Sequence, residues 1–503
     1  MHNRVKSFFG GLIVDTLSLP LTMFIGILIT PLFFRFISVA EFGYWVTVLD
    51  FVGFLYILNT GIAIYLVQTI AKEATTGIED TKVSISSVTV FQFSLVIVLL
   101  LVCLCVYIFY PSFGDQTNQF VDYHFFIGLM GIFVAANAIW GWQNGILYGQ
   151  NRVTLSNTLG MIQKLLMQLL PISFLFIGFG LISFPISYII ISLILVVLST
   201  FFTWNYLKQR FSFSSIRRER INDISLFNFR SMMGGTSYYV LNFTDTIIIA
   251  NFLSSSSVTV YVLTMKLANF AKFIPGKVIS LAFPSIAQLI AEKNYERLQP
   301  VSIKLFKVGL RIGLFSGAVI FFLNGLFVPH WVGSDKFGGK MLSYMSAVIC
   351  LRESIALLFI HIIYSTREIK TINYILFFEA IANIILSIIL LRFLDINGVA
   401  LATIISSCFL SLGYAWYKAS KIIHATKFHF IRPLIHTIVY FSPTFAILWV
   451  GSILIGHDFS WILFVGLVLI AGLINVICFE GTTIYKYRKL SVKEIAFKVI
   501  NEA

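Results

Sequence analysis

The sequence predicts an all-α polytopic membrane protein with about 14 transmembrane helices. Of the 503 residues, 58% are hydrophobic and only 12% are charged, and the mean hydropathy is +0.90. This apolar fraction exceeds what the core of a soluble domain requires. Apolar runs of about 20 residues, the length that crosses a bilayer as a helix, recur along the whole chain. We therefore expect a bundle of membrane-spanning helices and no soluble domain.

The first predicted span is a retained helix rather than a cleaved signal, because Asp15 and Pro20 interrupt it and no small-residue cleavage site follows. Pro275 and Pro284 predict bends in the eighth span, since proline removes a backbone donor and crowds the preceding turn. The fourteen spans are predicted at 11–34, 42–70, 86–109, 124–148, 154–178, 181–205, 229–252, 258–288, 306–329, 342–364, 371–391, 397–416, 434–455 and 461–484.

Basic residues are divided unequally between the two sides of this predicted bundle. Of the 36 lysines and arginines, 25 fall in the N-terminus, the C-terminal tail and the connections after even-numbered helices, when Lys307 at the very edge of its span is counted with its connection. Because cytoplasmic loops retain basic residues, both termini are predicted to be cytoplasmic. The net charge of +14 then indicates topology and attraction to anionic membrane lipids, not nucleic-acid binding. The opposite connections hold only Arg35, Lys336, Lys340 and Arg392.

A weak internal repeat predicts two halves of six helices each. The segment 151–170 aligns with 367–386 at an offset of 216, which places Asn157 on Asn373, and Tyr44 falls on Tyr261 at an offset of 217. Because six is even, the halves run parallel and face each other across a central cavity. The domains are predicted as an N-terminal six-helix lobe at 1–207, a basic cytoplasmic linker at 208–225, a C-terminal six-helix lobe at 226–420, and helices 13 and 14 with a cytoplasmic tail at 421–503.

Three cations are predicted near the middle of the membrane. Counting 1.5 Å per residue along each helix places Lys164, Lys266 and Arg352 at about the same depth, roughly 15 Å. An uncompensated cation there is costly, so these residues call for an anionic partner, and we predict that all three face one cavity. Pairing of Lys164 with Glu379 is an open alternative. The secondary cationic candidates, nearer the cytoplasmic face, are Arg311, Lys272 and Lys277.

Acidic residues within the spans are candidates either for carrying a coupling ion, H⁺ or Na⁺, or for pairing with these cations. Asp245 lies at roughly the depth of Lys266, so a structural pair is an open alternative. Glu353 follows Arg352, and because adjacent residues on a helix point about 100° apart, the two need not neutralise each other. The coupling-ion candidates are Asp50, Asp245, Glu379, Glu353 and Asp15.

No catalytic constellation, metal site or cofactor site is predicted. The five cysteines lie in apolar spans without metal-ligand or disulfide spacing, and neither a nucleophile elbow nor a phosphate-binding loop is present. A membrane polymerase or glycosyltransferase is expected to expose catalytic acids in a large loop, whereas the longest external connection, 111–124, is short. The sequence therefore favours a transporter over an enzyme.

Several segments resemble the bacterial polysaccharide flippases, the O-antigen and repeat-unit branch of the multidrug, oligosaccharidyl-lipid and polysaccharide exporter superfamily. The resemblance extends over all fourteen spans. The segments that carry it are EFGYW at 41–45, ILYGQNRVTLSNTLGMIQKLL at 146–166, DTIIIANFLSSSSVTVYVLTMKL at 245–267, FPSIAQL at 283–289 and GVALATIIS at 398–406.

The resemblance implies two lobes that carry an undecaprenyl-diphosphate-linked oligosaccharide from the cytoplasmic to the outer leaflet of the inner membrane by alternating access, driven by an ion gradient. A polysaccharide polymerase and a chain-length regulator are implied partners. The midplane cations suit the diphosphate. A glycan also needs polar and aromatic groups, although the same groups equally serve as contacts between helices. The glycan-lining candidates are Asn137, Trp140, Trp142, Gln143, Asn144, Asn242 and Tyr238.

Two alternative functions fit the same architecture. A cation-coupled multidrug antiporter would use Asp50, Asp15 and Asp245 for cation binding, but a chamber for cationic drugs favours acidic and aromatic lining over lysine and arginine. A peptidoglycan-precursor flippase differs only in its glycan, which composition does not distinguish.

Overall fold

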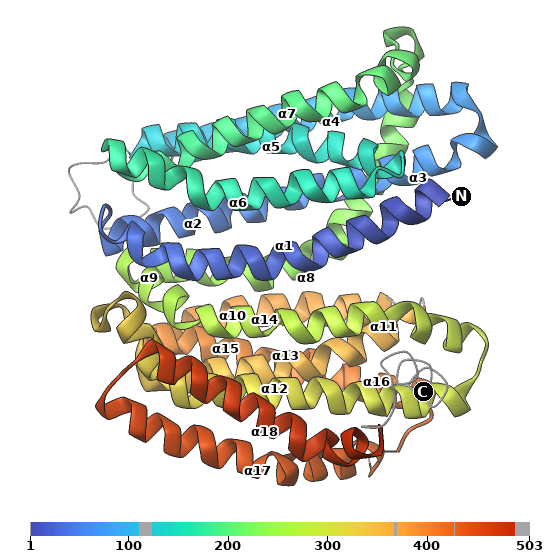
Figure 1. Cartoon of the computed structure of the whole chain (residues 1–503). Helices are drawn as coiled ribbons and strands as arrows, with labels where there is room; N and C mark the ends of the chain where they lie inside the picture. The colour runs from blue at the N-terminus through green and yellow to red at the C-terminus, as the bar shows by residue number, and fades with distance from the viewer. Residues whose placement is uncertain (1, 110–122, 367–369, 427, 488–503) are drawn as a thin grey trace. The chain divides into compact units, whose positions relative to one another are not determined.

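A computed structural model describes residues 2–109, 123–366, 370–426 and 428–487, and all the secondary structure in these ranges is helical. The predicted external connection at 111–124 lies almost entirely outside them. The chain forms two compact units, unit 1 at Met1–Thr259 and unit 2 at Val260–Ala503. Each unit is a bundle of long helices that run side by side (Figure 1).

The described part of unit 1 contains eight α-helices and the first half of a ninth. The second predicted span is divided into α2 and α3 by a 3₁₀ turn, η1, and α4 to α7 follow as long hairpin-connected helices. Their bounds are α1 His2–Phe33, α2 Val39–Leu55, η1 Tyr56–Asn59, α3 Thr60–Thr76, α4 Ile78–Phe109, α5 Tyr123–Gly149, α6 Val153–Ile177, α7 Ser183–Arg210, α8 Arg218–Phe252 and α9 Ser255–Thr264.

Unit 2 begins within α9 and continues to the C-terminus. The eighth predicted span is broken into α9, α10 and α11, and the twelfth contains a five-residue π-helix, η5. The bounds are α10 Lys266–Ala271, α11 Phe273–Ala291, α12 Tyr295–Val332, α13 Gly339–Ser365, α14 Lys370–Leu394, α15 Ile396–Ser407, η5 Cys408–Leu412, α16 Gly413–Ile422, α17 Phe428–His457 and α18 Trp461–Tyr487.

Among the described residues, thirteen helical stretches are long and apolar enough to cross a membrane, which confirms the polytopic all-α prediction. The predicted span at 229–252 is not among them. It lies in α8, which carries Arg230, Asn242 and Asp245 among its apolar residues. Such polar residues belong against protein or water rather than lipid, so a hydropathy window underrates this helix.

The two units repeat a local feature at the predicted offset of 216. In unit 1 the hydroxyl of Tyr148 on α5 donates a hydrogen bond to the amide oxygen of Asn157 on α6. In unit 2 Tyr364 on α13 donates to Asn373 on α14, at 3.4 Å. The same pair therefore closes the same helix hairpin in both units, as expected of parallel repeats.

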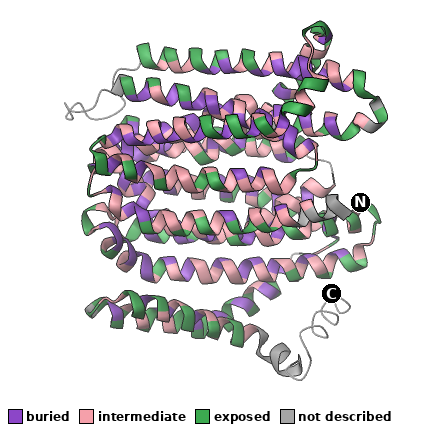
Figure 2. Cartoon of the chain, turned by 45° about the horizontal axis from the view of Figure 1, so that its top comes forward, coloured by how far each residue is buried: buried purple, intermediate pink, exposed green. Residues whose placement is uncertain are grey.

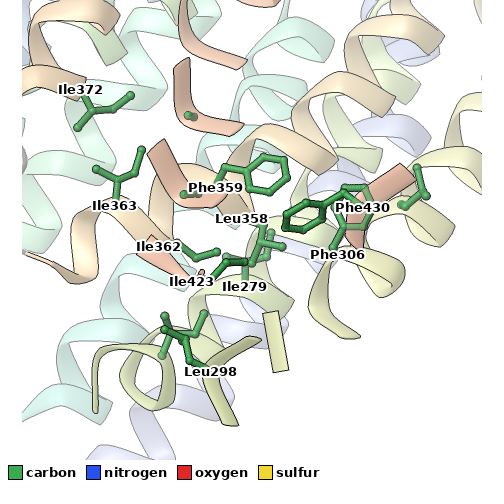
Figure 3. Packing of buried hydrophobic residues seen from close by; sticks show 14 residues of the cluster. Ile279, Leu298, Phe306, Leu358, Phe359, Ile362, Ile363, Ile372, Ile423 and Phe430 are labelled. Atoms are coloured by element: carbon green, nitrogen blue, oxygen red, sulfur yellow. The ribbon is translucent and has the colours of Figure 1, made fainter. Parts of the chain in front are cut away.

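Apolar side chains pack inside each unit and also cover its outer faces. A large cluster in unit 2 includes Phe306, Phe359 and Phe430, whose rings contact one another at tilted and edge-on angles (Figure 3). Figure 2 shows that exposed residues are frequent along the helices. On α17 and α18 many of these exposed residues are apolar, such as Leu454 and Ile462. Exposed apolar surface on this scale fits contact with lipid.

The predicted basic linker is held against unit 1 by its own charges. Arg210 donates from Nε to Glu73 at 2.9 Å and stacks over the ring of Tyr206 at 4.1 Å. Arg220 pairs with Asp80 near the start of α4. These contacts tie the ends of α7 and α8 to α3 and α4, so this segment is packed structure in the folded chain.

Candidate functional site

Lys266 lies at a helix break that side chains from other elements hold in place. The break falls between Thr264, the last residue of α9, and Lys266, the first of α10. The fully buried Asn324 on α12 donates its amide N–H groups to the Thr264 carbonyl and to Ser343 Oγ, both at 3.0 Å. The Thr264 hydroxyl oxygen accepts from Gly338 N at 2.9 Å. Side-chain capture of a helix carbonyl is a recognised cause of a kink.

A second break follows one and a half turns later. Helix α10 ends at Ala271 and α11 starts at Phe273. Pro275 explains this break, because its ring crowds the carbonyl four residues earlier, at Ala271, and the predicted bend is confirmed. Within the described part of unit 2, Lys266 takes part in no ion pair and its side chain is partly exposed. Its pairing with Asp245 would join the two units and stays a prediction.

Arg352 on α13 forms an ion pair with its neighbour Glu353. Adjacent helix positions need not pair, but the guanidinium Nη1 of Arg352 lies 2.9 Å from Glu353 Oε2. Both side chains are long enough to bend across the 100° that separates their Cα–Cβ directions. Helix α10 packs against the same helix, where Ala268 and Ala271 meet Cys350.

Buried and half-buried polar side chains form a row, here called the Glu379 seam, between α14 and the α15–η5 helix. Its members are Glu379, Asn383, Thr403 and Ser411. The side chain of Glu379 is 2% exposed, accepts a hydrogen bond from Ser411 in η5, and lies within electrostatic reach of Arg352 and Glu353. Asn383 follows one turn later and donates to Thr403 at 3.0 Å. Among the described residues, one carboxylate oxygen of Glu379 and the Asn383 amide oxygen find no hydrogen-bond donor. Inward-facing oxygens of this kind suit a proton or a small cation.

The remaining predicted cations differ in their surroundings. Lys164 on α6 is exposed in unit 1. Lys272 donates to Asn269 Oδ1 at 3.1 Å, and Lys277 lies over the ring of Phe273 at 5.7 Å. These contacts hold the two secondary lysines close to their own helices.

Arg311 lies in an apolar groove of unit 2. Its guanidinium lies over the ring of Phe479, at 4.2 Å. The groove runs between α10, α12 and α18, has a volume of about 490 Å³, and is lined largely by apolar side chains with Asn475 as a second polar residue. A groove with this lining fits an amphiphile with a long apolar chain and an anionic end.

The predicted acids of unit 1 lie in two places. Asp50 on α2 accepts a hydrogen bond from the Thr246 hydroxyl of α8 at 2.7 Å, and Asp245 lies within electrostatic reach. Asp15 on α1 lies near Tyr148. The structure thus brings Asp50 and Asp245 together at the α2–α8 contact.

Most glycan-lining candidates of unit 1 join helices to one another. Trp140 donates to Gln163 Oε1 at 3.0 Å, and Gln163 donates to Asn137 at 2.7 Å. Gln143 donates to Thr200 at 2.6 Å. Asn144 accepts from Ser156, and Trp142 is buried in a core cluster. These contacts match the alternative role, in which the polar residues join neighbouring helices by hydrogen bonds. A glycan-lining role for these residues stays a prediction.

Two glycan-lining candidates are different. Tyr238 on α8 is 63% exposed, and Asn242 one turn later is also exposed and bonds only to the Tyr238 carbonyl of its own helix, at 2.8 Å. Their outer edges are therefore accessible in unit 1.

Sequence reasoning missed the buried asparagines that shape the helix breaks. Asn228 on α8 does for unit 1 what Asn324 does for unit 2: it donates to the Leu58 carbonyl at 2.8 Å and accepts from Gly61 N at 2.9 Å. A Cβ on Gly61 would lie 2.6 Å from the Asn228 Cα, so this approach requires glycine. Asn383 was missed as well, although its spacing of four from Glu379 was a usable signal.

The thirteen apolar helical stretches of the described residues define a multi-pass membrane protein. The chain is similar to a structure described as lipid II flippase MurJ in an inward closed conformation, with a TM-score of 0.71 and 14% identity over 95% of this chain and 99% of that one. It is also similar to an inward-facing multidrug resistance MATE family transporter of the MOP superfamily, with a TM-score of 0.64 and 14% identity over 82% and 98% of the two chains.

An outward-facing MATE family transporter is a third similar structure, with a TM-score of 0.53 and 14% identity over 82% and 97% of the two chains. At this identity the likeness shows the fold. No curated protein sequence matches the chain. Residues 9–290, more than half of the chain, match the family described as polysaccharide biosynthesis protein. The chain therefore belongs to the polysaccharide biosynthesis protein family.

Proposed function

We propose that this protein is a flippase that carries an undecaprenyl-diphosphate-linked oligosaccharide repeat unit from the cytoplasmic to the outer leaflet of the bacterial inner membrane by alternating access. The observation that carries the proposal is Lys266, a cation within a membrane-crossing helix at a break fixed by a buried asparagine. A diphosphate that leaves water needs such donors to replace its hydration. Arg352 is the second diphosphate contact and Lys164 the third.

The apolar groove beside Arg311 supports the same proposal. A lipid-linked substrate has an apolar chain that stays in the hydrocarbon and an anionic group that does not. The groove offers both environments on neighbouring surfaces, with α10 as one wall. The isoprenoid chain would follow the groove while Lys266, at the start of α10, receives the phosphates.

Ion coupling is proposed for Glu379, with Asp50 and Asp245 as the corresponding acids of unit 1. Support comes from the Glu379 seam, because a carboxylate that accepts from Ser411 and faces Arg352 changes its interactions when it binds a proton or a sodium ion.

A second proposal is that both termini face the cytoplasm and that a polysaccharide polymerase and a chain-length regulator act on the product.

A cation-coupled multidrug antiporter is the competing function, and a peptidoglycan-precursor flippase is a further one. The full chain reconstituted in proteoliposomes tests the class directly. We expect it to expose a fluorescent undecaprenyl-diphosphate oligosaccharide to an external quencher, and to leave a cationic dye in place. Export of the dye without movement of the lipid would overturn the proposal, and preference for a lipid carrying a peptide-bearing disaccharide would favour the peptidoglycan precursor.

A further inference from the structure

A basic pocket lies at one end of unit 2, where three helices stop. Helix α11 ends at Ala291, α13 at Ser365 and α16 at Ile422. The pocket has a volume of about 820 Å³, and none of its eleven lining residues, all of them described, is acidic. Its basic lining consists of Lys293, Lys418, Lys421 and His424.

Two of these basic residues have a backbone conformation that usually belongs to glycine. Lys293 has a φ of 54° and His424 a φ of 52°. Each residue follows the end of a helix and donates a backbone hydrogen bond back to that helix. Lys293 N donates to Ile290 O at 3.1 Å, and His424 N donates to Lys421 O at 3.3 Å. Glycine is the common residue at this left-handed cap, because a Cβ crowds the backbone. At both positions the sequence instead places a basic side chain at the pocket.

The pocket is built on a packed base. The rings of Tyr295 and His424 meet edge to face at 4.3 Å, and Gln299 donates to the His424 carbonyl at 3.0 Å. Tyr295 packs against the apolar cluster of unit 2. Leu298 and Ile423, which are close in sequence to Tyr295 and His424, are buried members of this cluster (Figure 3). A site that is held before a ligand arrives pays less ordering entropy on binding.

Helix capping alone accounts for part of this arrangement. A helix C-terminus carries about half a negative charge, so basic side chains stabilise it. Four basic side chains gather at these three helix ends, and none of the lining residues, all of them described, is acidic. The Ser365 and Thr366 hydroxyls donate to their own helix at 2.7 and 2.8 Å, so an anion would be held by lysine and histidine. The lining of the pocket is therefore basic.

We propose that this pocket binds the phosphate of an anionic lipid headgroup. It lies at the end of unit 2 where the spans stop, which the partition of basic residues predicts to be the cytoplasmic surface. Anionic lipids concentrate there, and basic residues near that surface attract them. Ala287 and Ile290 on the wall suit the glycerol and upper chain of such a lipid. The lipid is either a bulk phospholipid or the diphosphate lipid of the proposed cargo; the site itself does not depend on flipping.

Native mass spectrometry of the full-length protein, delipidated and then mixed with equimolar phosphatidylglycerol and phosphatidylcholine, tests the pocket. We expect selective phosphatidylglycerol adducts, and about tenfold weaker phosphatidylglycerol binding in the Lys418→Ser, Lys421→Ser double variant. The matched control is Lys304→Ser with Lys307→Ser, two lysines near the start of α12 that do not line the pocket. An equal loss in both double variants would overturn the proposal.

A second variant separates binding from folding. Replacing Lys293 and His424 by glycine relieves the left-handed backbone and removes the ring contact of His424 with Tyr295. These two effects oppose each other, so the Tm should change little while phosphatidylglycerol binding weakens several-fold. Unchanged phosphatidylglycerol binding in this variant would contradict the proposal. Displacement by undecaprenyl diphosphate better than by phosphatidylglycerol identifies the cargo as the ligand, and the reverse identifies bulk lipid. Displacement by polyglutamate but by neither lipid would instead assign the pocket to an acidic protein segment.

Discussion

Each unit contains a transmembrane helix that is broken near a buried asparagine, but the two breaks differ in charge. In unit 1 the break between α2 and α3 is held by Asn228 and consists of Tyr56–Asn59, without a charged residue. In unit 2 the break after α9 is held by Asn324 and opens on Lys266. The two units thus contain the same kind of helix break, but only the break of unit 2 carries a charged residue.

The acidic residues of the two units also differ in their partners. In unit 1 Asp50 and Asp245 meet where α2 packs on α8, with Thr246 as a donor. In unit 2 Glu353 pairs with Arg352, and Glu379 lies within electrostatic reach of the same arginine. Under the proposed function, unit 2 would supply the groups for the anionic substrate, and its acids would compete for the same arginine.

The largest effect is expected from removing the charge at the break of unit 2. Lys266→Ala removes a charged hydrogen bond to phosphate, which is worth about 1.5–3 kcal/mol. The flipping rate should therefore fall about 10- to 100-fold. The flipping rate of Arg352→Ala should fall less, because Glu353 already pairs with that arginine. Asn59→Ala at the break of unit 1 is the control and should change flipping by less than about twofold. Fluorescent-lipid translocation at equal protein levels checks this, and normal rates in both cation variants would refute the assignment.

A second effect concerns ion coupling at the seam. Glu379→Gln keeps the shape and removes the ionisable group, so transport driven by a proton or sodium gradient should fall about tenfold, equivalent to one charged hydrogen bond. The residual rate should no longer respond to the gradient. The measurement is lipid translocation with and without ionophores. A variant that still accelerates in a gradient would remove Glu379 from the coupling mechanism and leave Asp50 as the candidate.

The asparagines give a smaller, matched pair of effects. Asn324→Leu and Asn228→Leu each strand buried polar backbone or hydroxyl groups, at a cost of about 1–3 kcal/mol of folding stability. We expect similar drops in Tm for both. Only Asn324→Leu should also weaken binding of undecaprenyl diphosphate, because only its break carries the lysine. Equal weakening of binding in the two variants would mean that the breaks are not functionally distinct.

The smallest effect is expected from the polar network of unit 1. Trp140→Phe keeps an aromatic ring in the core and removes the hydrogen bond to Gln163, which is worth about 1 kcal/mol of stability. Flipping rates should stay unchanged if the network only joins helices. A selective loss of flipping with normal Tm would show instead that Trp140 contacts the glycan.

Local sequence signals predicted much of the fold and less of the site. Thirteen spans follow from hydropathy alone, and the break before Pro275 follows from the ring of proline. The kink at Lys266 did not, because its cause is Asn324, which is 60 residues away in sequence. The pair between Arg352 and Glu353 depends on side-chain rotamers, which helix periodicity does not specify. The span at 229–252 was predicted from an apolar run like the others, although the polar residues of α8 keep that helix out of the thirteen apolar stretches.

The most direct test of the central claim is the affinity of the purified chain for undecaprenyl diphosphate in nanodiscs. Lys266→Ala should bind it at least about tenfold more weakly than the unaltered protein. Lys336→Ala is the control, since the ammonium of Lys336 already pairs with Asp335 at 2.8 Å in the turn between α12 and α13. The account predicts unchanged affinity for Lys336→Ala. Equal affinities for all three proteins would contradict the assignment of the charged break as the diphosphate site.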